Sequence, residues 1–152
     1  MIFFLIVVFL IPVICISKEL NPETWNEVWE FYERTHFYNK TNIVNSSDII
    51  SVWVYKIMTD DDRAKIIEIV KKHDLEKSDK FKDCDHQLIL EEIDCQKRLY
   101  RVKELAYYDD MDKVLENNSY PDNQWVSIPQ SSIVEELYNR TCKSSKETSE
   151  KQ

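Results

Sequence analysis

Hydrophobic residues form one unbroken run at the start of the chain. Residues 1–17 contain no charged side chain and read MIFFLIVVFLIPVICIS. A membrane-spanning helix needs about 20 apolar residues, so this shorter run is typical of a signal peptide, and the small residues Cys15 and Ser17 predict cleavage after Ser17. The alternatives are an uncleaved anchor helix and lipidation at Cys15, which Pro12 and Ile14 disfavour because they do not fit a lipobox.

The clearest strand pattern lies at residues 49–57, I-I-S-V-W-V-Y-K-I, which are almost all β-branched or aromatic. Apolar residues occupy both parities, which predicts a central strand covered on both faces. Residues 86–93 and 98–108 predict two more strands, joined as a hairpin across D-C-Q-K. In the second of them, alternation predicts four side chains on one face: Tyr100, Val102, Ala106 and Tyr108.

Weaker patterns predict further extended segments. The aromatic run at 25–38 fits one or two strands with a bend near 33–35, although a helix from Pro22 competes because the same apolar residues also fit helical spacing. Residues 39–48 are turn-like. Short extended pieces follow at 113–116 and 125–128.

Two segments change to a helical period. Residues 60–73 begin with three aspartates and end with Lys71, Lys72 and His73, which matches the helix dipole at both ends. The charged stretch that follows, 74–83, predicts a solvated loop.

The last helix begins at Ser132, which forms an S-x-x-E capping box with Glu135. Cys142 lies at the end of the buried stripe of this helix and therefore faces the body of the protein. The polar segment 143–152 predicts a disordered tail.

Composition narrows the possible functions. Removal of the first 17 of 152 residues leaves enough chain for one domain, which we place at 18–142. The net charge of −8 disfavours nucleic acid as a partner. Glycine is absent, which excludes glycine-rich phosphate and dinucleotide loops. Turns that need positive φ are expected to use Asn or Asp instead.

Three cysteines remain after the predicted cleavage: Cys84, Cys95 and Cys142. In an exported protein this number favours one disulfide and one leftover thiol. Cys95 lies within the predicted sheet and Cys84 at a loop edge, so we pair Cys95 with Cys142; a bridge through Cys84 is the alternative. The chosen bridge would close a loop of about 47 residues and stabilise the fold by roughly 3–4 kcal/mol.

Candidate catalytic and metal sites are weak. Cys84 with His86 could suggest a thiol nucleophile, but side chains two apart in a strand meet poorly and neighbouring aspartates raise a thiol pKa. An intermolecular disulfide or an inert buried thiol is favoured for Cys84. We therefore predict no enzyme, no cofactor and no metal site. The other candidates lack ligand spacing: His36, His73, Asp109, Asp110 and Asp112.

Six motifs occur in a particular order along residues 25–142. They are Trp25, Val52–Val54, Glu92–Arg101, Tyr108–Asp109, Trp125–Pro129 and Ser132–Cys142. Their order resembles the bacterial surface-adhesin protein E family. The most specific parts are the D-C-x-x-x-x-x-R block around Cys95 and the terminal S-x-x-E-x-L-Y-x-x-x-C helix.

The resemblance implies an α+β fold, in which an antiparallel sheet of about six strands carries a C-terminal helix tied to it by the Cys95–Cys142 disulfide. The helix at 60–73 would then be an insertion, and the turn after Tyr108–Asp109 lacks the glycine usual in the family. The four tryptophans, Trp25, Trp29, Trp53 and Trp125, are expected in the core.

The resemblance also implies a function. It favours an exported, non-enzymatic protein-binding module in the periplasm or at the cell surface, with host extracellular-matrix proteins as possible ligands and homodimers possible. Contact with the membrane would be through the signal peptide alone. The alternative is a periplasmic structural or envelope-homeostasis protein without a host ligand.

Overall fold

The computed structural model describes residues 27–149, and for 143–149 it describes the backbone alone. The predicted signal peptide, its cleavage after Ser17 and the predicted role of Trp25 lie outside the described residues. Within 27–149, no helix has the length and apolar character needed to cross a membrane.

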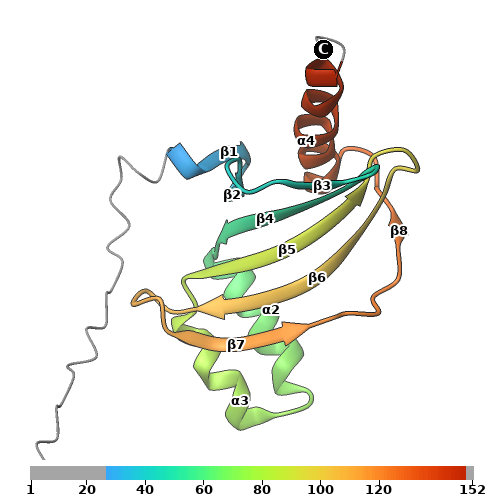
Figure 1. Ribbon diagram of the computed structural model, residues 1–152. Helices are drawn as coiled ribbons and strands as arrows, with labels where there is room; N and C mark the ends of the chain where they lie inside the picture. The colour runs from blue at the N-terminus through green and yellow to red at the C-terminus, as the bar shows by residue number, and fades with distance from the viewer. Residues whose placement is uncertain (1–26, 150–152) are drawn as a thin grey trace, which may run out of the picture.

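An antiparallel sheet forms the body of the protein (Figure 1). Its six main strands have the order β1-β2-β4-β5-β6-β7, while β3 pairs with β4 and β8 with β6. The strands are β1 Trp29–Glu33, β2 His36–Asn39, β3 Val44–Ser46, β4 Ile49–Ile57, β5 His86–Asp94, β6 Leu99–Tyr108, β7 Val114–Ser119 and β8 Val126–Ser127. The predicted α+β class and the six-stranded sheet are confirmed. Two strands with a bend between them, predicted for the aromatic run, are confirmed from residue 29 on.

A β-bulge in the β5–β6 hairpin corrects one prediction. Glu91 pairs with Val102 whereas Leu90 pairs with Glu104, so Lys103 is an extra residue in β6. An extra residue reverses the facing of every side chain beyond it. Tyr100 and Val102 therefore lie on one face of the sheet and Ala106 and Tyr108 on the other, not on a common face as predicted.

The predicted helix at 60–73 is confirmed as α2, Asp60–Lys71. Its N-cap is Thr59, whose side chain accepts a hydrogen bond from the backbone N–H of Asp62, while the Asp62 carboxylate accepts from the Thr59 N–H. This capping box fixes where the helix begins.

The predicted loop at 74–83 is wrong. The segment forms a short helix α3, Leu75–Asp79, followed by a 3₁₀ turn η1, Lys80–Asp83. Phe81 is 2% exposed and packs edge-on against Tyr107 of β6, with ring centres 5.1 Å apart. Burial of Phe81 therefore packs the otherwise charged segment 74–83 against the sheet.

The C-terminal helix α4, Ile133–Ser149, extends beyond the predicted end at Cys142, so residues 143–149 are helical rather than a disordered tail. Ser132 caps it as predicted, because its Oγ accepts a hydrogen bond from the Glu135 N–H at 3.1 Å. The Glu135 carboxylate reaches one residue further back than a capping box requires, to the N–H of Ser131.

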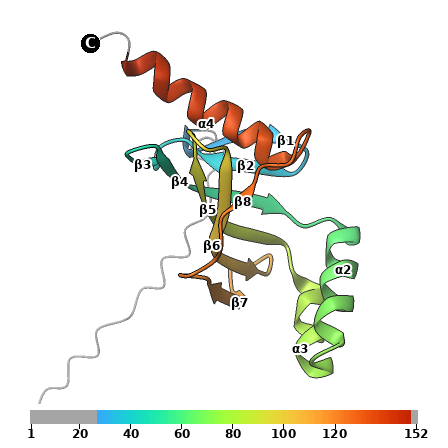
Figure 2. The same cartoon turned by 90° about the vertical axis from the view of Figure 1, so that its right-hand side faces the viewer.

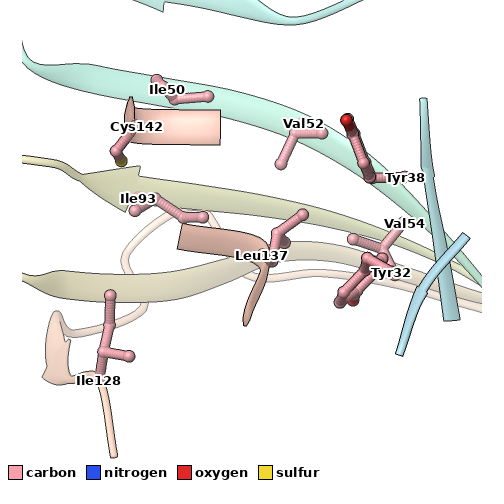
Figure 3. Close-up of a cluster of buried hydrophobic side chains, with 9 residues drawn as sticks. All are labelled: Tyr32, Tyr38, Ile50, Val52, Val54, Ile93, Ile128, Leu137 and Cys142. Atoms are coloured by element: carbon pink, nitrogen blue, oxygen red, sulfur yellow. The ribbon is translucent and has the colours of Figure 1, made fainter. Parts of the chain in front are cut away.

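Two hydrophobic clusters lie on one face of the sheet, which we call the helix face. On β4 and β5 it carries Ile50, Val52, Val54, Ile89 and Ile93. The first cluster joins these residues to α4 through the fully buried Leu137 (Figure 3). The second joins Tyr107 of β6 to η1 and α2 around Phe81. Figure 2 shows α2 and α3 beside the sheet and α4 across its other end.

The Cys95–Cys142 disulfide links the β5–β6 turn to α4, with 5.6 Å between the Cα atoms. It is the predicted pairing, and it closes a loop with a sequence separation of 47. The alternative bridge through Cys84 does not occur, since Cys84 is a free, buried thiol. The Tyr138 hydroxyl also donates to the Cys95 carbonyl at 3.2 Å, which holds the same junction.

Candidate binding face

The opposite face of the sheet, which we call the open face, has no helix over it in the part of the chain that the structure describes (Figure 1). Because side chains alternate along a strand, this face receives the other parity of β4 and its neighbours. Its main members are Phe31, Phe37, Trp53, Tyr55, Leu88 and Leu90. The register therefore places aromatic and aliphatic side chains on both faces, while helices cover one.

A row of aromatic rings runs across the open face from β1 to β6. The ring centres of Phe31 and Phe37 are 5.5 Å apart, and those of Phe37 and Tyr55 are 6.4 Å apart. The row continues from Tyr55 to His86 at 4.6 Å and from His86 to Tyr108 at 4.9 Å. These spacings are those of attractive aromatic pairs, so cross-strand contacts hold the row in one arrangement.

The exposure of the row changes along its length. Phe31 at the β1 end is 51% exposed and Ile57 on the same face is 42% exposed, whereas His86 is 4% exposed. Aromatic residues at accessible positions bring large contact area at low entropic cost, which is why they are enriched in protein interfaces. The β1–β2–β4 end of the open face is therefore the part best suited to contact another protein.

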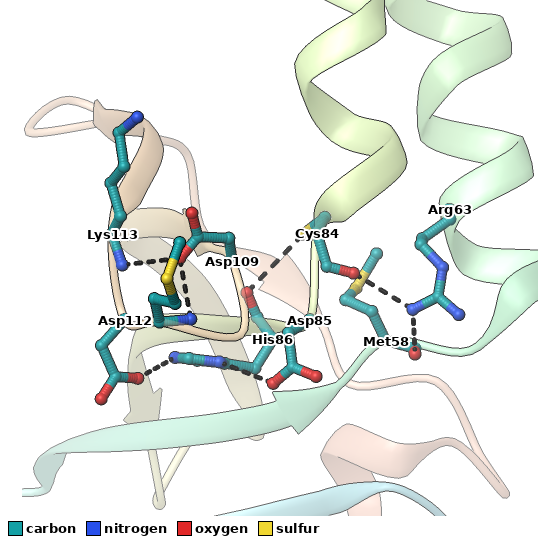
Figure 4. A network of polar contacts seen from close by, with 9 residues as sticks. Met58, Arg63, Cys84, Asp85, His86, Asp109, Asp112 and Lys113 are labelled. Carbon is teal, nitrogen blue, oxygen red and sulfur yellow. Dashed lines mark hydrogen bonds and ion pairs between the residues drawn. The ribbon is translucent and has the colours of Figure 1, made fainter. Parts of the chain in front are cut away.

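His86 lies between two tyrosine rings. Its two ring nitrogens face the carboxylates of Asp85 and Asp112 (Figure 4). Its ring stacks on Tyr108 with 4° between the planes and on Tyr55 with 19°. Nδ1 is 3.1 Å from Asp85 and Nε2 is 3.6 Å from Asp112. These contacts fix the inner end of the aromatic row, and burial raises the pKa of Tyr55, which keeps its hydroxyl protonated.

The tryptophans correct a further prediction. Trp29, Trp53 and Trp125 are all half-buried, and none of them belongs to either hydrophobic cluster. Trp29 contacts Tyr55 on the open face with ring centres 5.7 Å apart, and Trp125 stacks under the Arg101 guanidinium at 4.4 Å. They line the surface of the sheet rather than fill its core.

Cys84 has the surroundings of a structural thiol. It is 1% exposed and packs with Met58 and Phe81. Burial is the main cause that raises the pKa of its thiol, and the sulfur donates to the His86 carbonyl at 3.7 Å (Figure 4). A buried, protonated thiol is a poor nucleophile, which supports the inert-thiol interpretation over catalysis.

The histidines and aspartates considered as ligands are not brought together. Within the described residues no group of three or more His, Cys, Asp or Glu side chains could hold a metal ion. His36 lies by the helix face beside Tyr32, where burial, above all, lowers its pKa to about 4. Asp109 organises the β6–β7 turn, because its Oδ1 accepts from the N–H groups of Met111 and Lys113.

The open face was not predicted as a site. The signal was present in the parity of residues 49–57, where Trp53 and Tyr55 alternate with Val52 and Val54. The two-sided pattern predicts a strand covered on both faces, and this is wrong, because the helices of the described residues cover one face of the sheet. The sequence does not specify that the α2–η1 segment and helix α4 pack on the same face of the sheet.

Fold and face together define the class: an α+β protein in which a single antiparallel sheet carries helices on one face and an aromatic row on the other. The structure is similar to that of protein E of Haemophilus influenzae, with a TM-score of 0.50 and 6% sequence identity over 77% of this chain and 85% of that one. At this identity the likeness concerns the fold. No curated protein matches the sequence significantly.

Residues 25–143 match the family described as Surface-adhesin protein E. This range is most of the chain, and it contains every strand of the sheet and the two disulfide cysteines. The chain therefore belongs to the Surface-adhesin protein E family, a family of surface adhesins.

Proposed function

We propose that this protein is an exported, non-enzymatic binding module that recognises a protein ligand through the β1–β2–β4 end of its open face. The observation that carries the proposal is the aromatic row, whose outermost ring, Phe31, is half-exposed. Membership of a family of surface adhesins supports a binding role for this row. Residues 1–17 act as a signal peptide in this proposal, and the mature chain begins at residue 18.

Host extracellular-matrix proteins are the ligand class that the family points to. The open face suits a protein ligand in general, because its most exposed members, Phe31 and Ile57, are apolar and charged residues such as Glu33 and Arg34 follow Phe31. Apolar centres with polar rims are the usual arrangement of protein interfaces. The buried Cys84 supports a role without catalysis.

Binding of the purified mature protein to a panel of immobilised matrix proteins tests the proposal. Saturable binding to at least one of them is expected, and Phe31→Ser should weaken it by tenfold or more, since single aromatic anchors often carry that share of affinity. Leu75→Ser is the matched control, because Leu75 is 64% exposed on α3, away from the open face. Absence of saturable binding, or equal loss in both variants, would overturn this proposal.

The second candidate is a periplasmic envelope protein without a host ligand. Pro12 and Ile14 favour it, because they depart from a lipobox and so disfavour an outer-membrane lipid anchor at Cys15. Cell fractionation with intact-mass measurement separates the two candidates. Surface exposure of a chain cleaved after Ser17 supports the adhesin, and a wholly periplasmic chain supports the alternative.

A further inference from the structure

Helix α2 is held against the helix face at its first turn more than along its length. The Lys56 ammonium lies 2.9 Å from the Asp62 carboxylate, and the Arg63 guanidinium donates to the carbonyls of Met58 and Cys84. Although partial burial opposes it, hydrogen bonds from Lys56 and Thr59 hold the pKa of Asp62 at about 2, so this anchor stays charged.

The rest of α2 leaves its apolar stripe incompletely covered. None of its residues is buried, although Ile66, Ile67 and Val70 form the stripe that faces the sheet. Ile69, beside them, is 60% exposed. A helix in a domain of this size normally buries such a stripe, so the space between α2 and the sheet needs an explanation.

That space is a cavity of about 340 Å³. Its apolar lining comes from Ile66, Ile69 and Val70 of α2, together with Met58, Phe81 and Tyr107. Concave, mostly apolar pockets with a few polar groups at the rim are the usual form of small-molecule sites, and this volume lies at the small end of their range.

The lysines around the rim of the cavity differ in whether a carboxylate contacts them. Lys77, which lines the cavity, and Lys80, which does not, both contact the Glu116 carboxylate at 2.6 Å, and these hydrogen bonds lower the pKa of Glu116. Asp62 is paired with Lys56, as described above. Lys65 also lines the cavity, is exposed, and makes no ion pair with any residue of the described part. Positive charge is therefore in excess around the rim, because two lysines share the Glu116 carboxylate and Lys65 contacts no carboxylate of the described residues.

We propose that this cavity binds a single-chain amphiphile with an anionic head, of the chemical class of a fatty acid. The apolar tail lies between the α2 stripe and the Phe81–Tyr107 pair, and the head group meets the Lys65 ammonium at the rim. The site lies on the helix face, so it is separate from the protein-binding surface proposed for the open face. The two proposals are therefore independent, and failure of one does not affect the other.

Displacement of cis-parinaric acid, a fluorescent fatty acid, from the full mature protein tests this inference. Below its micelle concentration, dodecanoic acid should displace the probe, whereas dodecyltrimethylammonium, with the same tail and a cationic head, should be at least tenfold weaker. Equal potency of the two compounds would overturn the assignment of an anionic head, and absence of saturable probe binding would overturn the site.

Two pairs of variants locate the bound probe. Ile69→Glu places a carboxylate at the rim and should weaken binding at least tenfold, while Leu75→Glu, an equally exposed apolar residue outside the cavity, should leave it unchanged. Lys65→Gln should weaken binding about threefold, as expected for an exposed ion pair, and Lys71→Gln on the same helix should not. Unchanged binding in Ile69→Glu, or equal loss in Leu75→Glu, would overturn the proposal. Circular dichroism of each variant confirms that the fold is kept.

Discussion

At the scale of single residues, Glu91 has the least favourable surroundings. It lies on the helix face between Val52 and Val102, is buried, and its Oε2 has no hydrogen-bond partner in the described residues. Burial raises the pKa of its carboxyl to about 7. The folded chain therefore holds a proton there that the unfolded chain releases near pH 4.5.

Glu91→Gln should make the protein more stable at alkaline pH. A folded pKa above the unfolded one means that the stability from the bound proton is fully present below about pH 4.5 and is lost as pH rises through 7. At pH 8 the variant should gain about 3 kcal/mol over the original chain, and at pH 4.5 almost nothing. Urea unfolding at both pH values measures this, with the exposed Glu76→Gln as control. An equal effect at both pH values would contradict it.

The turns show what a chain without glycine does. Positive φ angles occur at Arg34, Ser47, Arg98, Asp112 and Ser131, so the expected use of Asn or Asp holds at one of them. Contacts elsewhere in the fold compensate at Arg98, whose guanidinium bonds Glu135 at 2.5 Å and stacks on Tyr138. Such compensation comes from α4, far along the chain, and is not visible in the local sequence.

At the scale of elements, the segment from α2 to η1 forms a satellite core of its own around Phe81. The helix at 60–71 was predictable because its caps and stripe are local features. The turns after it were not, because a single Phe81 among charged residues gives no periodic pattern. The bulge at Lys103 was hidden for a similar reason, since it exists only in the pairing of two strands.

Phe81→Ala should loosen this satellite core while the α4 core remains. Removal of a buried aromatic side chain costs about 3–5 kcal/mol, and the edge-on contact with Tyr107 is lost as well. Hydrogen exchange should accelerate in α2 and α3 but not in β4 or β5. Leu75→Ala, an exposed change on α3, should have almost no effect. Uniform acceleration throughout the sheet would show that the two clusters unfold as one unit.

At the scale of the whole molecule, patterns of charge, period and cysteine placement predicted the main strands, the two main helices and the disulfide. The antiparallel sheet of about six strands followed from the resemblance to the family. The side of the sheet that stays open was not predicted. It depends on the α2–η1 segment and α4 packing on the same face of the sheet. This long-range packing is not specified by the two-sided apolar pattern of β4.

The disulfide should contribute substantially to overall stability. Replacing both Cys95 and Cys142 by Ser should lower the free energy of unfolding by about 3–4 kcal/mol, because the unfolded chain gains the freedom of a loop of 47 residues. Denaturant titration of the double variant measures the loss. Cys84→Ser keeps the bridge and serves as the control, and equal midpoints for the double variant and the original chain would contradict the expectation.

The bridge also decides how the molecule would carry mechanical load. A pulling force that enters through α4 passes at Cys142 directly to Cys95 and into the β5–β6 turn. The chain between the two cysteines, which includes all of β6, β7 and β8 and the first turns of α4, is bypassed by the covalent link. A force that enters at β1 instead meets the edge of the sheet, where hydrogen bonds to β2 can open one after another. Tension on the C-terminal side therefore spares the segment between the two cysteines, and tension on the N-terminal side does not.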